Sequence, residues 1–492
     1  MGPPRAARWL DLLGWVLLAL TGARFAVVVA GQLACPLDLE FETLQLRTVR
    51  VIESGANLYG AETYADLPFV FSVYTPLYHL LVAALPEAPG RPFLTGRIVS
   101  LAAMLLVGVS LFLVDGRRTR AGLAACACGW FLLLWPVAGH SAYMRHESLA
   151  LLFTAAAMLL LARPGARAAL GAAACCVLAL FVKQSYLAAP LAGLVFLPLA
   201  GRRRDALVFG GALAGLGATA GAAATLLWGE GFWFCTVAGT VDAWSGRQFL
   251  LALRSLLIQP AFVALLALAA AVAAGLARRG GLLSSLRESP YPAFALASTA
   301  LLLATVGKVG SHTLYAFEPI LALLMALVHE LRHSAPRPAI AAVAGAALLA
   351  IAAHDVARTA ELRTALKWPD PSSTVGRDYA DGARAALAQR GLEHPLALNL
   401  GPLRTVGAIT DEYCVNDALL YDRLFRTGRV SPEPLIEAIR HGVFDVVLLA
   451  AKQPVPPPAD ASDPMSRVVA AVCDSYRLAG RDLVLQYFLR DR

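Results

Sequence analysis

The chain has 492 residues, of which 58% are hydrophobic and 15% are charged, and its mean hydropathy is +0.62. A soluble protein has about 45–50% apolar and about 25% charged residues, so this composition excludes an ordinary soluble globular protein. The apolar runs are long and rich in Ala and Leu, unlike the roughly 10-residue alternating strands of a membrane barrel. The net charge of +8 comes from short arginine clusters, which in a membrane protein indicate orientation and not nucleic-acid binding. The composition therefore predicts a polytopic α-helical membrane protein.

Apolar runs of about 17–25 residues predict about eleven transmembrane helices. In chain order they cover residues 9–30, 93–114, 121–138, 148–162, 168–182, 186–200, 206–228, 250–276, 291–306, 314–330 and 337–353. Residues 31–92 form the first outer loop, in which 74–87 is a short juxtamembrane helix because prolines interrupt it. All the arginine clusters then fall on one side, which the positive-inside rule makes cytoplasmic: 117–120, 163–167, 202–204, 278–279 and 332–337. We expect a multi-pass protein of the inner or plasma membrane.

The composition changes after residue 354, where the charge rises and the apolar runs shorten. Segments 395–400 and 444–450 are typical of buried strands, and 435–442 is typical of a helix between such strands. The sequence thus predicts a transmembrane domain over 1–354 and a small α/β domain over 355–492 on the extracytoplasmic face.

Carboxylates stand at two predicted outer positions. Asp38 and Glu40 open the first outer loop, and in an extended segment residues two apart point the same way. Glu147 follows Arg145 and His146 at the mouth of the fourth span. A carboxylate near the low-dielectric membrane can act as a general base. The alternatives are a solvated loop start or helix cap for Asp38 and Glu40, and a salt bridge with Arg145 for Glu147.

Lys183 and Gln184 interrupt an apolar run near the end of the fifth span. A lysine in such a place pairs with an anion or extends its ammonium group to the interface. Lys183 is therefore a candidate ligand for a lipid phosphate, with simple extension to the interface as the alternative.

Another outer span boundary gathers Lys308, His312, Tyr315 and Glu318. Lys308 and His312 have the chemistry to contact a phosphate or a sugar, whereas His312 taken alone is equally consistent with an interfacial histidine. Tyrosines in the first outer loop are typical of an aromatic belt, and one or two of them are candidates for stacking on a sugar: Tyr59, Tyr64, Tyr74 and Tyr78.

These motifs occur in a characteristic order. An acid opens the first outer loop, VIESGANLY (51–59) and YTPLY (74–78) follow, RHE (145–147) lies in the next outer loop, and Lys183-Gln184 comes later. Over about residues 1–350 the chain resembles the GT-C glycosyltransferases. It is similar in particular to bacterial members of glycosyltransferase family 39, which resemble protein O-mannosyltransferases and the aminoarabinose transferases of lipid A. Glu147 departs from the pattern, since relatives often carry Arg-x-Asp there.

The resemblance implies transfer of a sugar from a polyprenyl-phosphate-linked donor on the outer face of the membrane. The acceptor would be an envelope glycan, lipid or protein. Asp38 would be the general base, with Glu40 and Glu147 as further catalytic acids. The leaving phosphate would be stabilised by cationic side chains: Lys183, Lys308 and Arg97. Substrate contacts are expected from Tyr59, Tyr74, Arg145, His146, Gln184, His312 and Tyr315. A divalent metal, Mg²⁺ or Mn²⁺, is left open, with Asp38, Glu40 and Glu147 as the ligands it would use.

Two other classes of protein fit part of the pattern. A secondary transporter or flippase of an amphipathic lipid would explain the number of spans and the intramembrane Lys183, but the chain shows no paired half-sequences. The other class is a non-catalytic scaffold that displays residues 355–492, in which the acids of the first outer loop would have no function.

Overall fold

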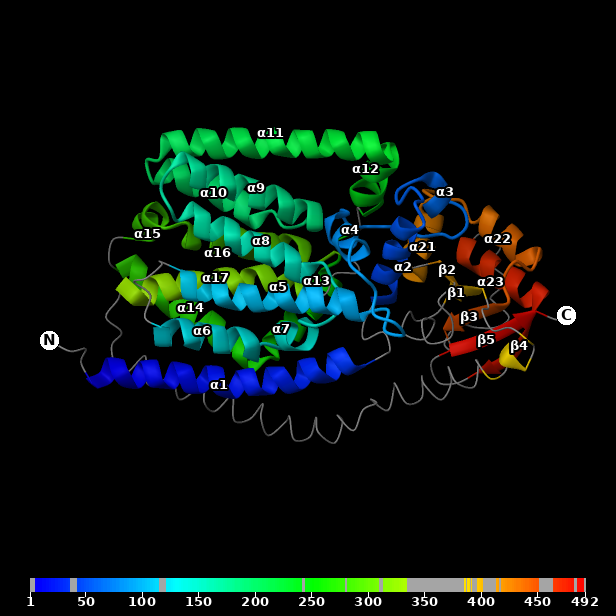
Figure 1. Ribbon diagram of the computed structural model, residues 1–492, viewed down its shortest axis with the longest axis horizontal. Coiled ribbons are helices and arrows are strands. Elements are labelled where there is room, and N and C mark those ends of the chain that lie inside the picture. The colour runs from blue at the N-terminus through cyan, green and yellow to red at the C-terminus, as the bar shows by residue number, and fades with distance from the viewer. Residues whose placement is uncertain are drawn as a thin grey trace.

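The computed structural model describes residues 5–35, 42–114, 121–240, 244–278, 281–308 and 313–333, together with shorter stretches between 385 and 490. Long helices form a bundle, and a smaller C-terminal domain lies at one end of it (Figure 1). The long helices are α1 (Arg5–Ala34), α5 (Leu94–Leu113), α6 (Ala121–Leu133), α8 (Glu147–Leu161), α9 (Ala166–Val182), α10 (Ala188–Leu199), α11 (Arg203–Trp228), α14 (Pro260–Arg278), α16 (Pro290–Thr305) and α17 (Phe317–His333). The shorter ones are α2 (Glu42–Glu53), α3 (Ala61–Tyr64), α4 (Leu77–Ala83), α7 (Trp135–His140), α12 (Glu230–Thr236), η2 (Ala238–Thr240), α13 (Gly246–Leu257), α15 (Leu282–Glu288) and η3 (Thr313–Ala316).

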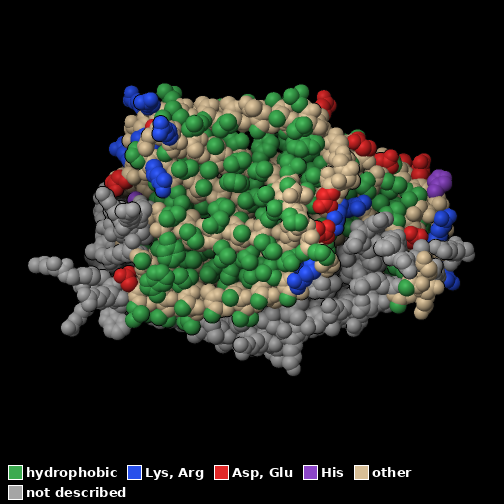
Figure 2. All heavy atoms as spheres, viewed as in Figure 1, with side chains coloured by type: hydrophobic (Ala, Val, Ile, Leu, Met, Phe, Trp, Pro, Cys, Tyr) green, Lys and Arg blue, Asp and Glu red, His purple; other side chains and the backbone are tan. Residues whose placement is uncertain are grey.

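Several helices have the length and composition of membrane spans. By these criteria four of the described helices qualify, at Asp11–Ala34, Leu94–Leu113, Arg203–Trp228 and Leu314–Leu331, and shorter apolar helices accompany them. Only 6% of the apolar window of α11 is buried inside the protein, so this helix needs an apolar solvent around it. Apolar side chains also cover most of the bundle face seen in Figure 2. The predicted helical, apolar architecture is confirmed, whereas the number of eleven spans stays a prediction.

The predicted span at 250–276 is wrong as a single helix. The chain forms α13 and α14 there, and the two helices meet at an angle of 91°. Pro260 starts α14, and a proline disfavours helical backbone at the residue before it, so the helix cannot run through this point. The segment 74–87, in contrast, contains the short helix that was predicted, α4.

The two ends of the bundle differ in charge. α8 and α9 pack side by side, and Arg163 lies in the turn between them. Arg202 lies in the next such turn, between α10 and α11, where basic side chains gather at the left of Figure 2. Glu147 begins α8 and Lys183 follows α9, so both lie at the opposite end, with the C-terminal domain.

The C-terminal domain contains a five-stranded mixed sheet in the order β2-β1-β3-β5-β4. Its strands are β1 (Ala397–Leu400), β2 (Tyr413–Cys414), β3 (Val446–Ala450), β4 (Tyr476–Arg481) and β5 (Leu485–Arg490). β1 runs parallel to β2 and β3, while β5 is antiparallel to β3 and β4. Among the described residues of this domain, three helices accompany the sheet: α21 (Ala418–Arg426), α22 (Glu433–Arg440) and α23 (Pro464–Ser475). The strands predicted at 395–400 and 444–450 and the helix at 435–442 are confirmed, and the predicted boundary at 354 lies outside the described residues.

This domain is docked on the first predicted outer loop. The Tyr421 hydroxyl donates to the Tyr64 carbonyl at 2.7 Å, and the Val415 N–H donates to the Pro68 carbonyl at 3.0 Å. The Phe69 ring is fully buried and lies 5.7 Å from that of Tyr421. The first predicted outer loop and the C-terminal domain therefore share one hydrophobic core. This core lies beside the end of the bundle that carries Glu147 and Lys183.

Candidate active site

A buried ion pair forms the centre of the candidate site. Glu147 is the first residue of α8 and Lys183 directly follows α9, so the antiparallel packing of the two helices brings them together. The Lys183 Nζ lies 2.9 Å from Glu147 Oε1, and the two residues are 5% and 3% exposed. A buried ion pair is retained only when both charges are compensated. The salt bridge of Glu147 is thus made with Lys183, 36 residues away, and the two polar interruptions seen in the sequence belong to one site.

Two tyrosine rings enclose the Lys183 ammonium group. Its Nζ lies 5.3 Å from the centre of the Tyr74 ring and 5.2 Å from that of Tyr315. Rings at this distance attract a cation and keep water from it. Burial raises the pKa of Tyr74 to about 12, against the opposing effect of Lys183, so its phenol stays neutral. Lys183 donates one of its three N–H bonds to Glu147, which leaves it capable of donating to an anionic ligand as well.

His146 completes the cluster as an uncharged ring. It stacks on Tyr74 with ring centres 3.8 Å apart, and its Nε2 lies 3.3 Å from Glu147 Oε1. Burial lowers the pKa of His146 to about 4, although the Glu147 carboxylate acts in the opposite direction. Arg145, 8% exposed, adds a second cation to the electrostatics of Glu147.

The motif residues around Tyr74 hold it in place. The Tyr59 hydroxyl donates to the Tyr74 carbonyl at 2.7 Å, and the Tyr59 ring is fully buried against Trp228 and Phe232. Tyr59, predicted to contact substrate, therefore lies in the core and supports the residue that faces Lys183. Gln184 has a similar role, because its Nε2 donates to the carbonyls of Val73 and Thr236.

A second buried ion pair fixes the loops beside the site. Arg97, on α5, donates from Nε to Glu42 Oε1 at 2.8 Å and from Nη1 to the Gln32 carbonyl at 2.8 Å and to the Cys35 carbonyl. Glu42 also accepts from the Met144 N–H at 2.7 Å, three residues before Glu147. Arg97, for which the sequence predicted a phosphate contact, joins the end of α1, the start of α2 and the loop that leads into α8.

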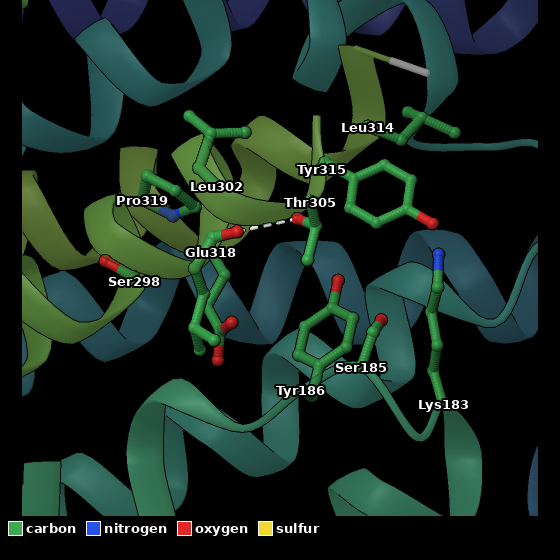
Figure 3. Close-up of a pocket in the computed structure, with 11 residues that line it drawn as sticks. Lys183, Ser185, Tyr186, Ser298, Leu302, Thr305, Leu314, Tyr315, Glu318 and Pro319 are labelled. Atoms are coloured by element: carbon green, nitrogen blue, oxygen red, sulfur yellow. Dashed lines mark hydrogen bonds between the residues drawn. The ribbon is translucent and has the colours of Figure 1, made fainter. Parts of the chain in front are cut away.

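A pocket opens next to the ion pair. It has about 400 Å³ of empty volume, including the part open to solvent, and lies between α16, α17 and the loop that joins α9 to α10. Its lining residues are Lys183, Ser185, Tyr186, Ser298, Leu301, Leu302, Thr305, Leu314, Tyr315, Glu318 and Pro319. In Figure 3, Lys183 and Tyr315 mark one end of the pocket, and Ser298 and Glu318 lie toward the other. The pocket thus combines a cationic end, leucine walls and a second polar end.

Other predicted site residues fall outside this cluster. Asp38, Glu40 and His312 lie outside the described residues. Lys308 follows α16 and pairs through its backbone with Trp244, and it does not line the pocket. Within the described part of the chain no three His, Cys, Asp or Glu residues group as metal ligands.

The fold of this bundle, with its appended α/β domain, is similar to that of a solved GT-C membrane protein, which agrees with the motif resemblance. Two solved structures match almost the whole chain, both of ArnT from Cupriavidus metallidurans, an aminoarabinose transferase of the GT-C family. The structure bound to undecaprenyl phosphate has a TM-score of 0.58, and the apo structure has 0.59. Each is 14% identical to this chain, and each match covers 95% of this chain and 97% of the other. No protein-family model and no curated protein sequence matches the chain.

Proposed function

We propose that the chain is a membrane glycosyltransferase that moves a sugar from a polyprenyl-phosphate-linked donor to an envelope acceptor, which is a glycan, a lipid or a protein. The observation that carries this proposal is the buried Lys183–Glu147 pair at the cationic end of a leucine-walled pocket. A polyprenyl-phosphate sugar would place its phosphate at Lys183 and its sugar ring in this pocket. The similarity in fold to an ArnT structure that holds undecaprenyl phosphate supports the same class of donor.

In the proposed reaction an acceptor hydroxyl oxygen attacks the anomeric carbon of the sugar, and the bond from that carbon to the phosphate oxygen breaks. The lipid phosphate leaves with the electron pair, and the acceptor proton goes to a carboxylate. Asp38 is the proposed base, with Glu40 beside it. Lys183 stabilises the charge that develops on the departing phosphate, and Glu147 holds Lys183 in position. We assign the phosphate contact to Lys183 and not to Arg97, because Arg97 is engaged with Glu42.

The proposed site faces the extracytoplasmic side of the inner or plasma membrane. Arginine-bearing turns lie at the end of the bundle opposite to Glu147 and Lys183, and arginines concentrate on cytoplasmic loops. The C-terminal domain, docked at the same end as the pair, would then lie outside the cytoplasm, where it can meet an envelope acceptor.

The test is donor turnover by the purified protein in lipid vesicles. Undecaprenyl-phosphate sugars are supplied, and release of undecaprenyl phosphate is measured; turnover supports the proposal, whereas uptake of the lipid without turnover supports a flippase. Asp38→Asn should abolish turnover without loss of expression or membrane insertion. Asp66→Asn is the matched control, because Asp66 is an exposed acid in the same outer loop. Full turnover by the Asp38 variant would remove this residue from the mechanism.

A further inference from the structure

The far end of the pocket holds a carboxylate that the proposed reaction does not use. Glu318, in the first turn of α17, is 8% exposed and lines the pocket. Its carboxylate accepts the Ala188 N–H at the start of α10, but its Oε1 has no hydrogen-bond partner among the described residues. A buried carboxylate oxygen without a donor is costly, so a ligand that brings a hydrogen-bond donor to it gains affinity.

The hydroxyl groups nearby do not supply that donor. Ser298 donates its hydroxyl hydrogen to the Ala295 carbonyl at 3.2 Å, and Thr305 donates to the Leu301 carbonyl at 2.7 Å. Both bonds lie within α16, so the two hydroxyl oxygens present acceptors to the pocket. This end of the pocket is therefore rich in acceptors, and it is complementary to a ligand that carries several O–H groups.

The chemistry of the proposed donor places such groups at this end. A glycosyl phosphate has its phosphate on the anomeric carbon and its hydroxyls around the rest of the ring. With the phosphate at Lys183, the ring lies between the leucine walls and its hydroxyls face away from the phosphate. Figure 3 shows Lys183 and Glu318 on opposite sides of Tyr186, as this arrangement requires.

Resting on the proposed function, we infer that Glu318 selects the donor by accepting a hydrogen bond from a hydroxyl of its sugar. The substrate class is thus a polyprenyl-phosphate sugar that bears a free hydroxyl opposite its anomeric carbon.

The test compares binding of undecaprenyl phosphate with and without a sugar. The wild-type protein should bind at least one member of a panel of neutral undecaprenyl-phosphate hexoses and pentoses more tightly than undecaprenyl phosphate itself. Glu318→Met should weaken that sugar-bearing lipid about tenfold or more, the cost of leaving a buried polar group without its partner, and should leave undecaprenyl phosphate within about twofold. Glu330→Met is the matched control, because Glu330 is a buried acid at the other end of α17 that pairs with Ser285, and it should change neither affinity.

Equal weakening of both lipids by Glu318→Met would overturn the inference, since Glu318 would then act only as the acceptor for Ala188 at the start of α10. No preference of the wild type for any sugar-bearing lipid would overturn it as well. Deoxy donors give a second test: loss of one ring hydroxyl should weaken binding to the wild type about tenfold, and Glu318→Met should not distinguish that deoxy donor from its parent. If the proposed function itself is wrong, the result differs from both of these, because undecaprenyl phosphate will then not bind at Lys183 at all.

Discussion

Removing the charge of Lys183 should lower both the stability of the protein and its affinity for the donor phosphate, and these two effects can be separated. Lys183→Met keeps the length of the side chain but leaves the Glu147 carboxylate, 3% exposed, without its cation. Breaking a buried pair on one side costs about 3–5 kcal/mol, whereas removing both charges together is far less costly. The double variant Lys183→Met with Glu147→Gln should therefore recover most of the stability that the single variant loses.

Binding of the donor phosphate should not recover with the stability. The Lys183 ammonium supplies the charge-assisted bond in the proposed site, so both variants should bind undecaprenyl phosphate at least about tenfold more weakly than wild type. Thermal unfolding in detergent measures the stability, and titration with undecaprenyl phosphate measures the affinity for the lipid. If the double variant regained stability and full binding together, Lys183 would be only a structural partner of Glu147, and the reasoning would be refuted.

Three further predictions concern the surroundings of the site. Glu42→Gln should lower the free energy of unfolding by about 3–5 kcal/mol, because it removes the carboxylate that pairs with the buried Arg97 guanidinium, and a loss under about 1 kcal/mol in thermal unfolding would argue against a stabilising role of this pair. Burial lowers the pKa of His146 from 6.5 to about 4. The neutral ring's contribution to the free energy of unfolding is therefore fully present above about pH 6.5 and is lost as the pH falls toward 4. The loss amounts to about 3 kcal/mol, and His146→Gln should show a correspondingly shallower decline in melting temperature from pH 7 to 4.5; identical slopes would contradict this assignment. A cysteine at exposed His441 should react with an impermeant maleimide in spheroplasts, and one at exposed Arg203 should not; the reverse pattern would invert the proposed orientation.

Those parts of the site that interrupt apolar runs could be predicted from the sequence. Lys183 and Gln184 stand out in a run of apolar residues, and Glu147 stands at the start of the next predicted span on the same side. A charge at such a place needs a partner, so the convergence of Glu147 and Lys183 follows once the spans alternate in direction. Tyr74 and Tyr315 were identified in the same way, as polar aromatic residues at span boundaries on that side.

The pairing of Arg97 with Glu42 could not be predicted in this way. The two residues are 55 positions apart, and periodicity specifies which face is apolar but not which charges meet across two loops. The burial of Tyr59 could not be predicted for a related reason, because a tyrosine beside a predicted membrane surface has the same sequence signature whether its ring is buried or open. The sequence shows Glu318 as an acid next to Pro319 at a span boundary. Only the structure shows that its Oε1 has no hydrogen-bond partner among the described residues and that it lines a pocket.

The central claim concerns where a lipid phosphate binds. A structure of this protein with undecaprenyl phosphate should place a phosphate oxygen about 2.7–2.9 Å from the Lys183 Nζ. A phosphate bound at the arginine-rich end of the bundle, with the Lys183–Glu147 pair untouched, would contradict the account.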